Sequence, residues 1–136
     1  MENNENIEKE IMDKLLIKRD QVDVDLRSIA ERLSGVFKIE ESGDVMFLDF
    51  SSLDDDQLML SLLTGKFFAA RWGIIDSDRM RITDISKTLV RPRQTLSTRI
   101  DKLVKRGLVS RDSTDGRYFI SKIRLKDIEQ VITGGK

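Results

Sequence analysis

The sequence contains neither cysteine nor histidine. Without cysteine the chain cannot form a disulfide framework, a thiolate metal site or a thiol nucleophile. Without histidine it lacks the commonest general base and the commonest metal ligand. The spacing of the carboxylates does not suggest a catalytic pair either. We therefore expect no enzyme activity, no metal and no cofactor.

Long apolar runs are also missing. The apolar stretches are too short to span a membrane, and the N-terminal sequence MENNENIEKE is acidic and polar, unlike a signal peptide. Aromatic residues are few, with six Phe, one Tyr and one Trp, which disfavours a surface that stacks single-stranded bases. We expect a cytoplasmic protein whose 136 residues form one domain, or one domain and a small extension.

Net charge is zero for the whole chain, but the two halves differ strongly. The chain has 24 basic and 24 acidic side chains. Residues 1–65 hold 16 acidic and 7 basic side chains, a net charge of −9, whereas residues 66–136 hold 8 acidic and 17 basic ones, a net charge of +9. Two differently charged solvated faces would explain this, but the pattern favours contact of the second half with a polyanion.

The basic residues concentrate in residues 82–111, which read as a short helix, a tight turn, a second amphipathic helix, a glycine and a strand. Only Asp84 and Asp101 are acidic in this segment. A compact basic helix-turn-helix is a candidate for reading a nucleic-acid groove. Its basic residues are Lys87, Arg91, Arg93, Arg99, Lys102, Lys105, Arg106 and Arg111.

The N-terminal half predicts two helices and a hairpin. Apolar spacing indicates a helix over 7–19 with the stripe Ile7, Ile11, Leu15, Met12 and Leu16. This stripe fits either packing on its own domain or dimerisation. A helix over 24–34 is expected, capped by Asp23 or Asp25, followed by strands at 36–40 and 45–50 around a turn at Gly43.

A long helix should follow over about 53–72. Ser52 and Asp55 have the spacing of a capping box, and Gly73 suits the C-terminal end. The Asp54–Asp56 run could suggest a metal, but adjacent positions on a helix do not face one point. We interpret these carboxylates as a favourable start of the helix.

Within the basic segment, a strand at 79–82 should lead to a helix over 84–89 capped by Thr83. Pro92 suits the first turn of a recognition helix over about 92–106, with Leu96, Ile100 and Leu103 as its core stripe. Strands at 108–111 and 117–124 then form a β-hairpin, which is the wing of residues 108–124. We expect Phe119 to point inward, and a last helix over 126–132.

Residues 53–124 resemble a winged helix-turn-helix of the MarR type, most specifically in the run LVKRGLVSRD-x-x-DGR. The resemblance implies sequence-specific binding of double-stranded DNA by a transcriptional regulator, usually a homodimer. Two positions depart from the family. Val90 occupies the turn position usually held by glycine, so we expect no positive φ there. Arg91 replaces an apolar residue, so we expect it to be exposed.

The long C-terminal dimerisation helices of MarR regulators are missing, so any dimer must use residues 1–50 or the first helix of the winged domain. The expected fold class is α+β and mainly helical. An acidic N-terminal region, residues 1–50, would precede a winged helix-turn-helix domain, residues 51–136.

The predicted DNA-binding residues lie on the helix-turn-helix and the wing. By matching position, the resemblance implies Arg93, Gln94, Ser97 and Thr98 as groove readers. The alternative function is a protein–protein interaction module in a replication, segregation or transcription complex. The sequence indicates neither the operator nor a small-molecule effector. The full predicted set is Lys87, Arg91, Arg93, Gln94, Thr95, Ser97, Thr98, Lys102, Lys105, Arg111 and Arg117.

Overall fold

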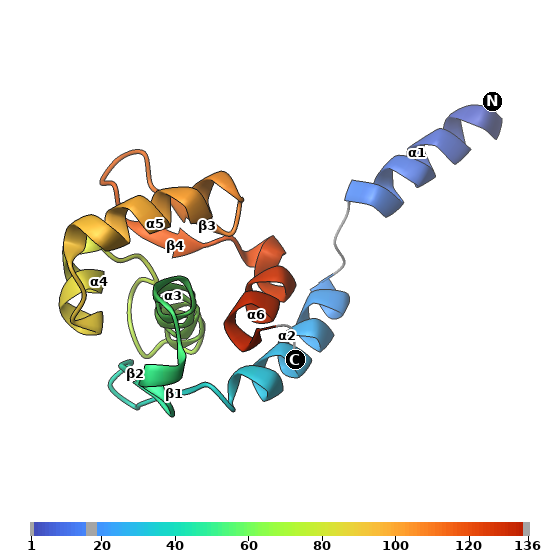
Figure 1. Cartoon of the computed structure of the whole chain (residues 1–136). Coiled ribbons are helices and arrows are strands. Elements are labelled where there is room, and N and C mark those ends of the chain that lie inside the picture. The colour runs from blue at the N-terminus through green and yellow to red at the C-terminus, as the bar shows by residue number, and fades with distance from the viewer. Residues whose placement is uncertain (1, 16–18, 135–136) are drawn as a thin grey trace.

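The computed structural model describes residues 2–15 and 19–134 (Figure 1). Helices dominate the described chain and two short antiparallel hairpins complete it, which confirms the predicted mainly helical α+β class. The elements, in chain order, are α1 (Glu2–Leu15), α2 (Arg19–Leu33), β1 (Phe37–Ile39), β2 (Val45–Phe47), η1 (Phe50–Ser52), α3 (Asp55–Arg71), α4 (Ile82–Leu89), α5 (Arg93–Lys105), β3 (Val109–Arg111), β4 (Tyr118–Ile120), η2 (Lys122–Arg124) and α6 (Leu125–Thr133).

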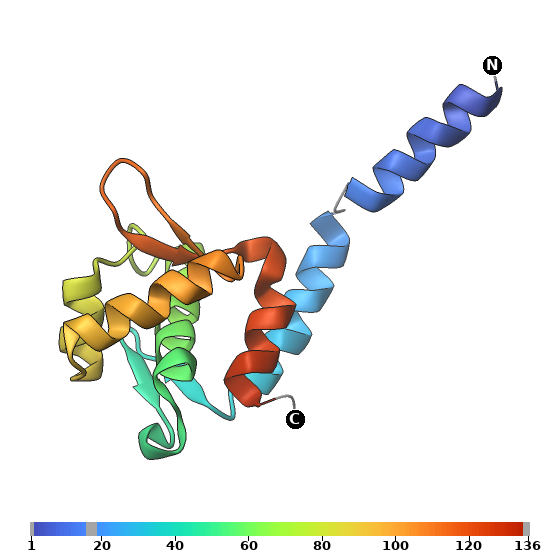
Figure 2. The ribbon, with the colours of Figure 1, turned by 45° about the horizontal axis from the view of Figure 1, so that its top comes forward.

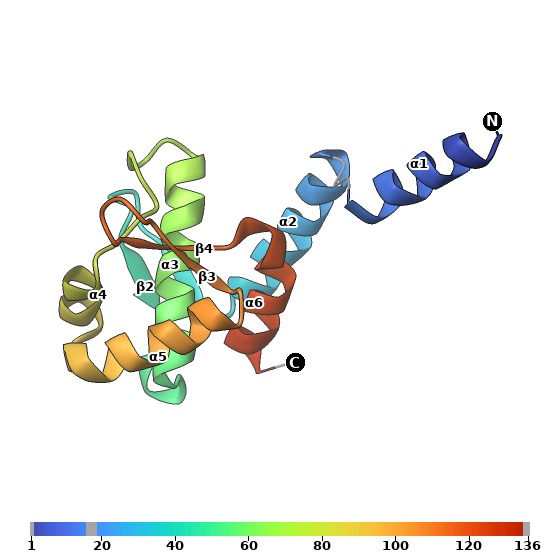
Figure 3. The same cartoon turned by 90° about the horizontal axis from the view of Figure 1, so that it is seen from above.

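Helix α3 is the centre of the fold, with α4 and α5 on one side and α6 on another (Figures 1 and 3). Every residue from Leu58 to Gly65 is buried, so this helix is enclosed on all sides. A helix that is apolar all round is expected at the centre of a domain. Because α5 and β4 both pack on it, α3 sets the position of the basic motif.

The start of α3 differs from the prediction. Asp54, rather than Ser52, caps the helix, and its side chain accepts a hydrogen bond from the Gln57 N–H at 2.8 Å. The Gln57 side chain in turn accepts from the Asp54 N–H at 2.9 Å, which completes a capping box. Gln57 Nε2 also donates to the carbonyls of Val131 and Ile132. The first turn of α3 is therefore fixed both locally and against α6.

The N-terminal helices begin earlier than predicted. Helix α2 starts at Arg19, so Asp23 and Asp25 lie within it and do not cap it. Leu16, predicted in the first apolar stripe, lies outside the described residues. Leu26, Ile29 and Leu33 of α2 are buried in the same hydrophobic cluster as α3 and α6.

A partly exposed ion pair also joins α2 to α6. Arg32 Nη1 lies 2.9 Å from Oε1 of Glu129, a carboxylate that is almost fully buried. Buried residues from both sides of residue 50 belong to the same hydrophobic cluster. The division into an N-terminal region, residues 1–50, and a winged domain, residues 51–136, stays a prediction.

Helix α1 projects away from the body of the molecule (Figures 1 to 3). Its apolar residues Ile7, Ile11, Met12 and Leu15 are 52%, 44%, 53% and 78% exposed. Exposed apolar residues at helical spacing usually mark an interaction surface.

The predicted first hairpin is present, with Phe37 opposite Phe47 and Gly43 in its turn at φ 91°. The hairpin packs closely on α3. A Cβ atom at Gly65 would lie 2.3 Å from Cγ2 of Val45, so a side chain there would push β2 away from the helix. Gly65 is thus a packing residue between helix and hairpin.

Three predictions about helix start, strand formation and side-chain orientation between residues 79 and 120 are wrong. Helix α4 already begins at Ile82, after Arg81, so Thr83 lies inside it and not at its cap. The expected strand at 79–82 is a single bridge between Met80 and Tyr118. In β4, Tyr118 and Ile120 are buried and Phe119 is on the opposite, partly exposed face. Successive side chains of a strand point to opposite faces, so the burial of Tyr118 turns Phe119 outward.

Candidate nucleic-acid interface

Helices α4 and α5 pack against each other and form the predicted helix-turn-helix. The turn contradicts the sequence expectation, because Val90 adopts the left-handed conformation with φ 54° and ψ 50°. A β-branched residue is strained in that region. Among the described residues other than glycine, Val90 alone has a positive φ, and its side chain is 84% exposed.

Ser86 holds this turn closed. Its carbonyl accepts hydrogen bonds from the N–H groups of Val90 and Arg91. Its hydroxyl donates to the Arg91 carbonyl at 2.6 Å. The end of α4 and the approach to α5 are therefore fixed by one side chain and its own carbonyl.

Helix α5 buries Leu96, Ile100 and Leu103, as the apolar spacing predicted. Its opposite face is exposed and carries Gln94, Thr98, Asp101, Lys102 and Lys105. The Thr98 hydroxyl donates back to the Gln94 carbonyl at 3.2 Å. We call this set the open face of α5. It combines cations with amide and hydroxyl groups, the groups that contact phosphates and base edges.

Arg91 is not exposed as predicted but half-buried. Its Nε atom lies 3.2 Å from Oδ1 of Asp55, without an aligned hydrogen bond, and its guanidinium lies 5.4 Å from the centre of the Phe50 ring. Arg99 makes a related contact. Its Nε atom lies 3.7 Å from Oδ2 of Asp55 and its Nη1 atom 3.5 Å from Oδ1 of Asp56. These two arginines point toward the first turn of α3.

The wing is a two-stranded hairpin (Figure 2). Val109 pairs with Ile120 and Arg111 with Tyr118. Asp112 organises its turn, since its carboxylate accepts from the N–H groups of Thr114 and Asp115. The same carboxylate pairs with Arg79. Arg79 also lies over the Phe119 ring, 4.4 Å from its centre. Arg79 thus ties the loop before α4 to the wing.

The two wing arginines are both engaged within the wing. Arg117 Nε donates to Asp115 Oδ2 at 2.8 Å, and the Arg111 guanidinium lies 5.4 Å from the centre of the Tyr118 ring. Hydrogen bonding from the Arg117 N–H, together with the charge of its side chain, holds the pKa of Asp115 below its ordinary value of 3.8. Burial raises the pKa of the Tyr118 phenol above its ordinary value of 10.0.

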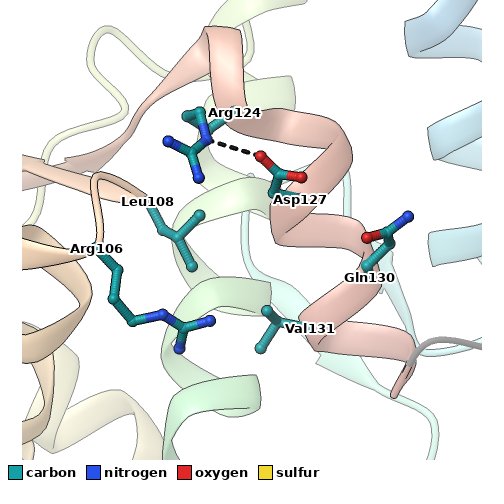
Figure 4. A pocket seen from close by; sticks show the side chains of 6 residues that line it. All are labelled: Arg106, Leu108, Arg124, Asp127, Gln130 and Val131. Atoms are coloured by element: carbon teal, nitrogen blue, oxygen red, sulfur yellow. Dashed lines mark hydrogen bonds and ion pairs between the residues drawn. The ribbon is translucent and has the colours of Figure 1, made fainter.

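Arg106, at the end of α5, faces a pocket and not the open face (Figure 4). The pocket has a volume of about 340 Å³ and lies between the end of α5, η2 and α6. Leu108 and Val131 supply its apolar lining, and Arg124 pairs across its edge with Asp127 at 2.7 Å. The basic residues of α5 therefore do not form one surface: Lys102 and Lys105 lie on the open face, Arg99 contacts α3, and Arg106 lines this pocket.

The structure places most of the predicted site residues on the surface of the helix-turn-helix, but these residues differ in solvent exposure. Arg91, Ser97 and Arg117 are half-buried. The remaining eight are exposed: Lys87, Arg93, Gln94, Thr95, Thr98, Lys102, Lys105 and Arg111.

Sequence reasoning did not identify the residues that position this surface. Asp55, Ser86, Arg79 and Asp112 hold the turn, the recognition helix and the wing through side-chain contacts. Each of these residues lies in a different element or turn from its partner, so the local sequence pattern could not predict the pairs. A hint existed only for Asp112, which opens the polar turn of the predicted wing.

Residues 72–117 match the model of the MarR family. The match begins directly after α3, covers α4 and α5 and ends in the wing. It supports the resemblance inferred from the sequence: this segment matches the winged helix-turn-helix of the MarR family, whose members are DNA-binding regulators rather than enzymes. No curated protein and no solved structure matches the chain. Among the helices of the described residues, none is both long and apolar enough to cross a membrane.

Proposed function

We propose that this MarR-family winged helix-turn-helix protein is a cytoplasmic transcriptional regulator that binds double-stranded DNA in a sequence-specific manner. The open face of α5 would enter the major groove, and the wing would contact the flanking backbone. One observation carries the proposal. Lys102 and Lys105 are exposed beside Gln94 and Thr98 on a helix whose opposite side is buried in the core.

The chemistry of this face suits duplex DNA better than the interaction of two proteins. Glutamine can pair with both N6 and N7 of adenine, and arginine with O6 and N7 of guanine. The exposed Arg93 and Gln94 lie at the first turn of α5, the end of a recognition helix that usually contacts bases. Lys102 and Lys105 lie further along and suit phosphates.

A homodimer would give the proposed regulator two half-sites. The exposed apolar residues Ile7, Ile11 and Leu15 make α1 the proposed dimerisation element. Duplication of the winged domain doubles the number of bases read, since one such module contacts a short site. Light scattering on the full chain and on a variant with Ile7→Asp and Ile11→Asp tests this. Dimers that persist in the variant, or a monomeric full chain at high concentration, refute it.

Selection of bound duplexes from a random pool tests the function. The proposal expects an enriched consensus, and a dimer expects that consensus to be palindromic. A variant with Lys102→Ala and Lys105→Ala serves as the matched control, since it keeps the buried face of α5. Recovery of no duplex above the control, even at low salt, would contradict the proposed function.

A further inference from the structure

The first turn of α3 contacts both the turn before the recognition helix and the helix itself. Asp55 lies between Arg91 and Arg99, 3.2 Å from Nε of the first and 3.7 Å from Nε of the second. Asp56 adds a contact of 3.5 Å to Nη1 of Arg99. One carboxylate thereby connects the turn of the helix-turn-helix, at Arg91, with the recognition helix, at Arg99.

Asp55 is itself held in place. It is the first residue of α3 and lies within the capping box that Asp54 and Gln57 form. The positive end of the helix dipole favours a carboxylate at this position. Asp55 and Asp56 are also partly buried, so solvent screens their ion pairs less than those of a fully exposed surface.

The turn that Asp55 supports is strained. Val90 adopts a left-handed conformation that is unfavourable for a β-branched residue. Such a conformation persists only where the surrounding structure fixes it. Ser86 fixes the turn through its backbone contacts, and the Arg91 side chain fixes it from the other side by packing on Asp55 and Phe50.

We propose that Asp55 is a positioning residue for DNA recognition, which holds Arg91 and Arg99 so that the first turn of α5 is preset for the groove. This inference rests on the proposed function and names a specificity determinant that does not touch DNA. Arg91 and Arg99 then act as internal contacts and not as phosphate ligands.

The proposal predicts an effect of unexpected sign. Removing a negative charge near a DNA-binding surface ordinarily strengthens binding, because the carboxylate repels phosphate. If Asp55 positions α5, its removal instead weakens binding to the preferred sequence. Sequence-independent binding depends on charge and not on the exact placement of α5, so it should not weaken.

The test compares Asp55→Asn with Asp84→Asn in the full chain. Asp84 is exposed in the first turn of α4, outside the open face of α5, and its carboxylate makes no hydrogen bond or ion pair within residues 19–134. Fluorescence anisotropy measures binding to the selected consensus duplex and to a scrambled duplex. We expect Asp55→Asn to weaken consensus binding about tenfold, which matches the coupling typical of contacting charged groups. Binding to the scrambled duplex should be unchanged or stronger.

Asp84→Asn should leave binding to both duplexes unchanged or strengthen both alike, so that the ratio between them is retained. If Asp55→Asn behaves in the same way, Asp55 acts only through its charge and the inference is overturned. If the wild-type chain binds neither duplex at low salt, the proposed function has failed instead. The two failures are therefore distinguishable.

Arg99→Gln provides a second variant that keeps the start of α3 intact. It should lower the preference for the consensus sequence while the dependence of affinity on salt stays as in the wild type, because Arg99 faces Asp55 and not phosphate. A salt slope reduced by about one would mean that Arg99 neutralises a phosphate, which would overturn the proposal. Thermal unfolding of both variants checks that neither effect reflects loss of the fold.

Discussion

Basic residues on two sides of helix α5 differ in their exposure and in their ion pairs. On the open face, Lys102 and Lys105 are exposed and form no ion pair within the described chain. On the side toward α3, Arg99 contacts Asp55 and Asp56. Sequence counts treat these residues as equal contributions to a basic patch. In the proposed function the two lysines supply charge to DNA, whereas Arg91 and Arg99, which contact Asp55, hold the motif that presents them.

The largest expected effect comes from the open face. Replacing Lys102 and Lys105 by alanine should lower affinity for every duplex about a hundredfold at moderate salt, because two phosphate contacts are lost. The salt slope should fall by about two. Anisotropy titrations of consensus and scrambled duplexes measure both quantities. A loss restricted to the consensus would show that these lysines read bases.

A smaller and more selective effect is expected at Gln94. Gln94→Ala should relax the preference at one base pair and weaken consensus binding by roughly 1–3 kcal/mol. The measurement is binding to a panel of duplexes that differ singly from the consensus. Lys105→Ala is the matched control, since it should weaken all members of the panel alike. Equal losses across the panel for both variants would remove the distinction between specificity and affinity on this face.

Unlike the preceding substitutions, which weaken DNA binding, a substitution that relieves the strain of the turn should increase the stability of the protein. Val90→Gly removes the unfavourable contacts of the left-handed conformation, which amount to roughly 1–2 kcal/mol, although the greater freedom of unfolded glycine offsets part of this gain. We expect a small net rise in the free energy of unfolding, measured by urea denaturation. The exposed position of Val90 excludes a compensating loss of core packing. Destabilisation would show that the turn is not strained in solution.

The smallest effect concerns the wing. Because the pKa of Asp115 is lowered on folding, its contribution is present at neutral pH and is lost only as the pH falls through the folded pKa, below 3.8. NMR titration of the Asp115 carboxyl should therefore show a midpoint below the ordinary value. Arg117→Gln should raise that midpoint, since it removes the side-chain hydrogen bond and the charge. An unchanged midpoint would mean that the pair with Arg117 does not form in solution.

The sequence predicted elements better than it predicted contacts. The amphipathic stripe of α5, the wing and the glycine after α5 followed from local spacing, and Gly107 indeed has φ 79°. The conformation of Val90 did not follow, because valine disfavours the region that the turn geometry requires. Tertiary packing overrode that local preference.

The environment of Arg91 and the orientation of Phe119 depended on distant partners. Asp55 belongs to a helix that precedes Arg91 by many residues, so periodicity could not pair them. In β4, a shift of one residue exchanges the two faces, and Tyr118 rather than Phe119 fits the core. The positions of exposed α5 residues were predictable because they depend on one helix alone.

Titration of the wild-type chain with its selected duplex over a range of salt concentrations tests the central claim most directly. If the open face of α5 and the wing bind DNA, the logarithm of affinity should fall linearly with the logarithm of salt concentration, with a steep slope from several neutralised phosphates. The consensus duplex should bind more tightly than a scrambled one at every salt concentration. Absence of binding at the lowest salt, or equal affinity for both duplexes throughout, would contradict the claim.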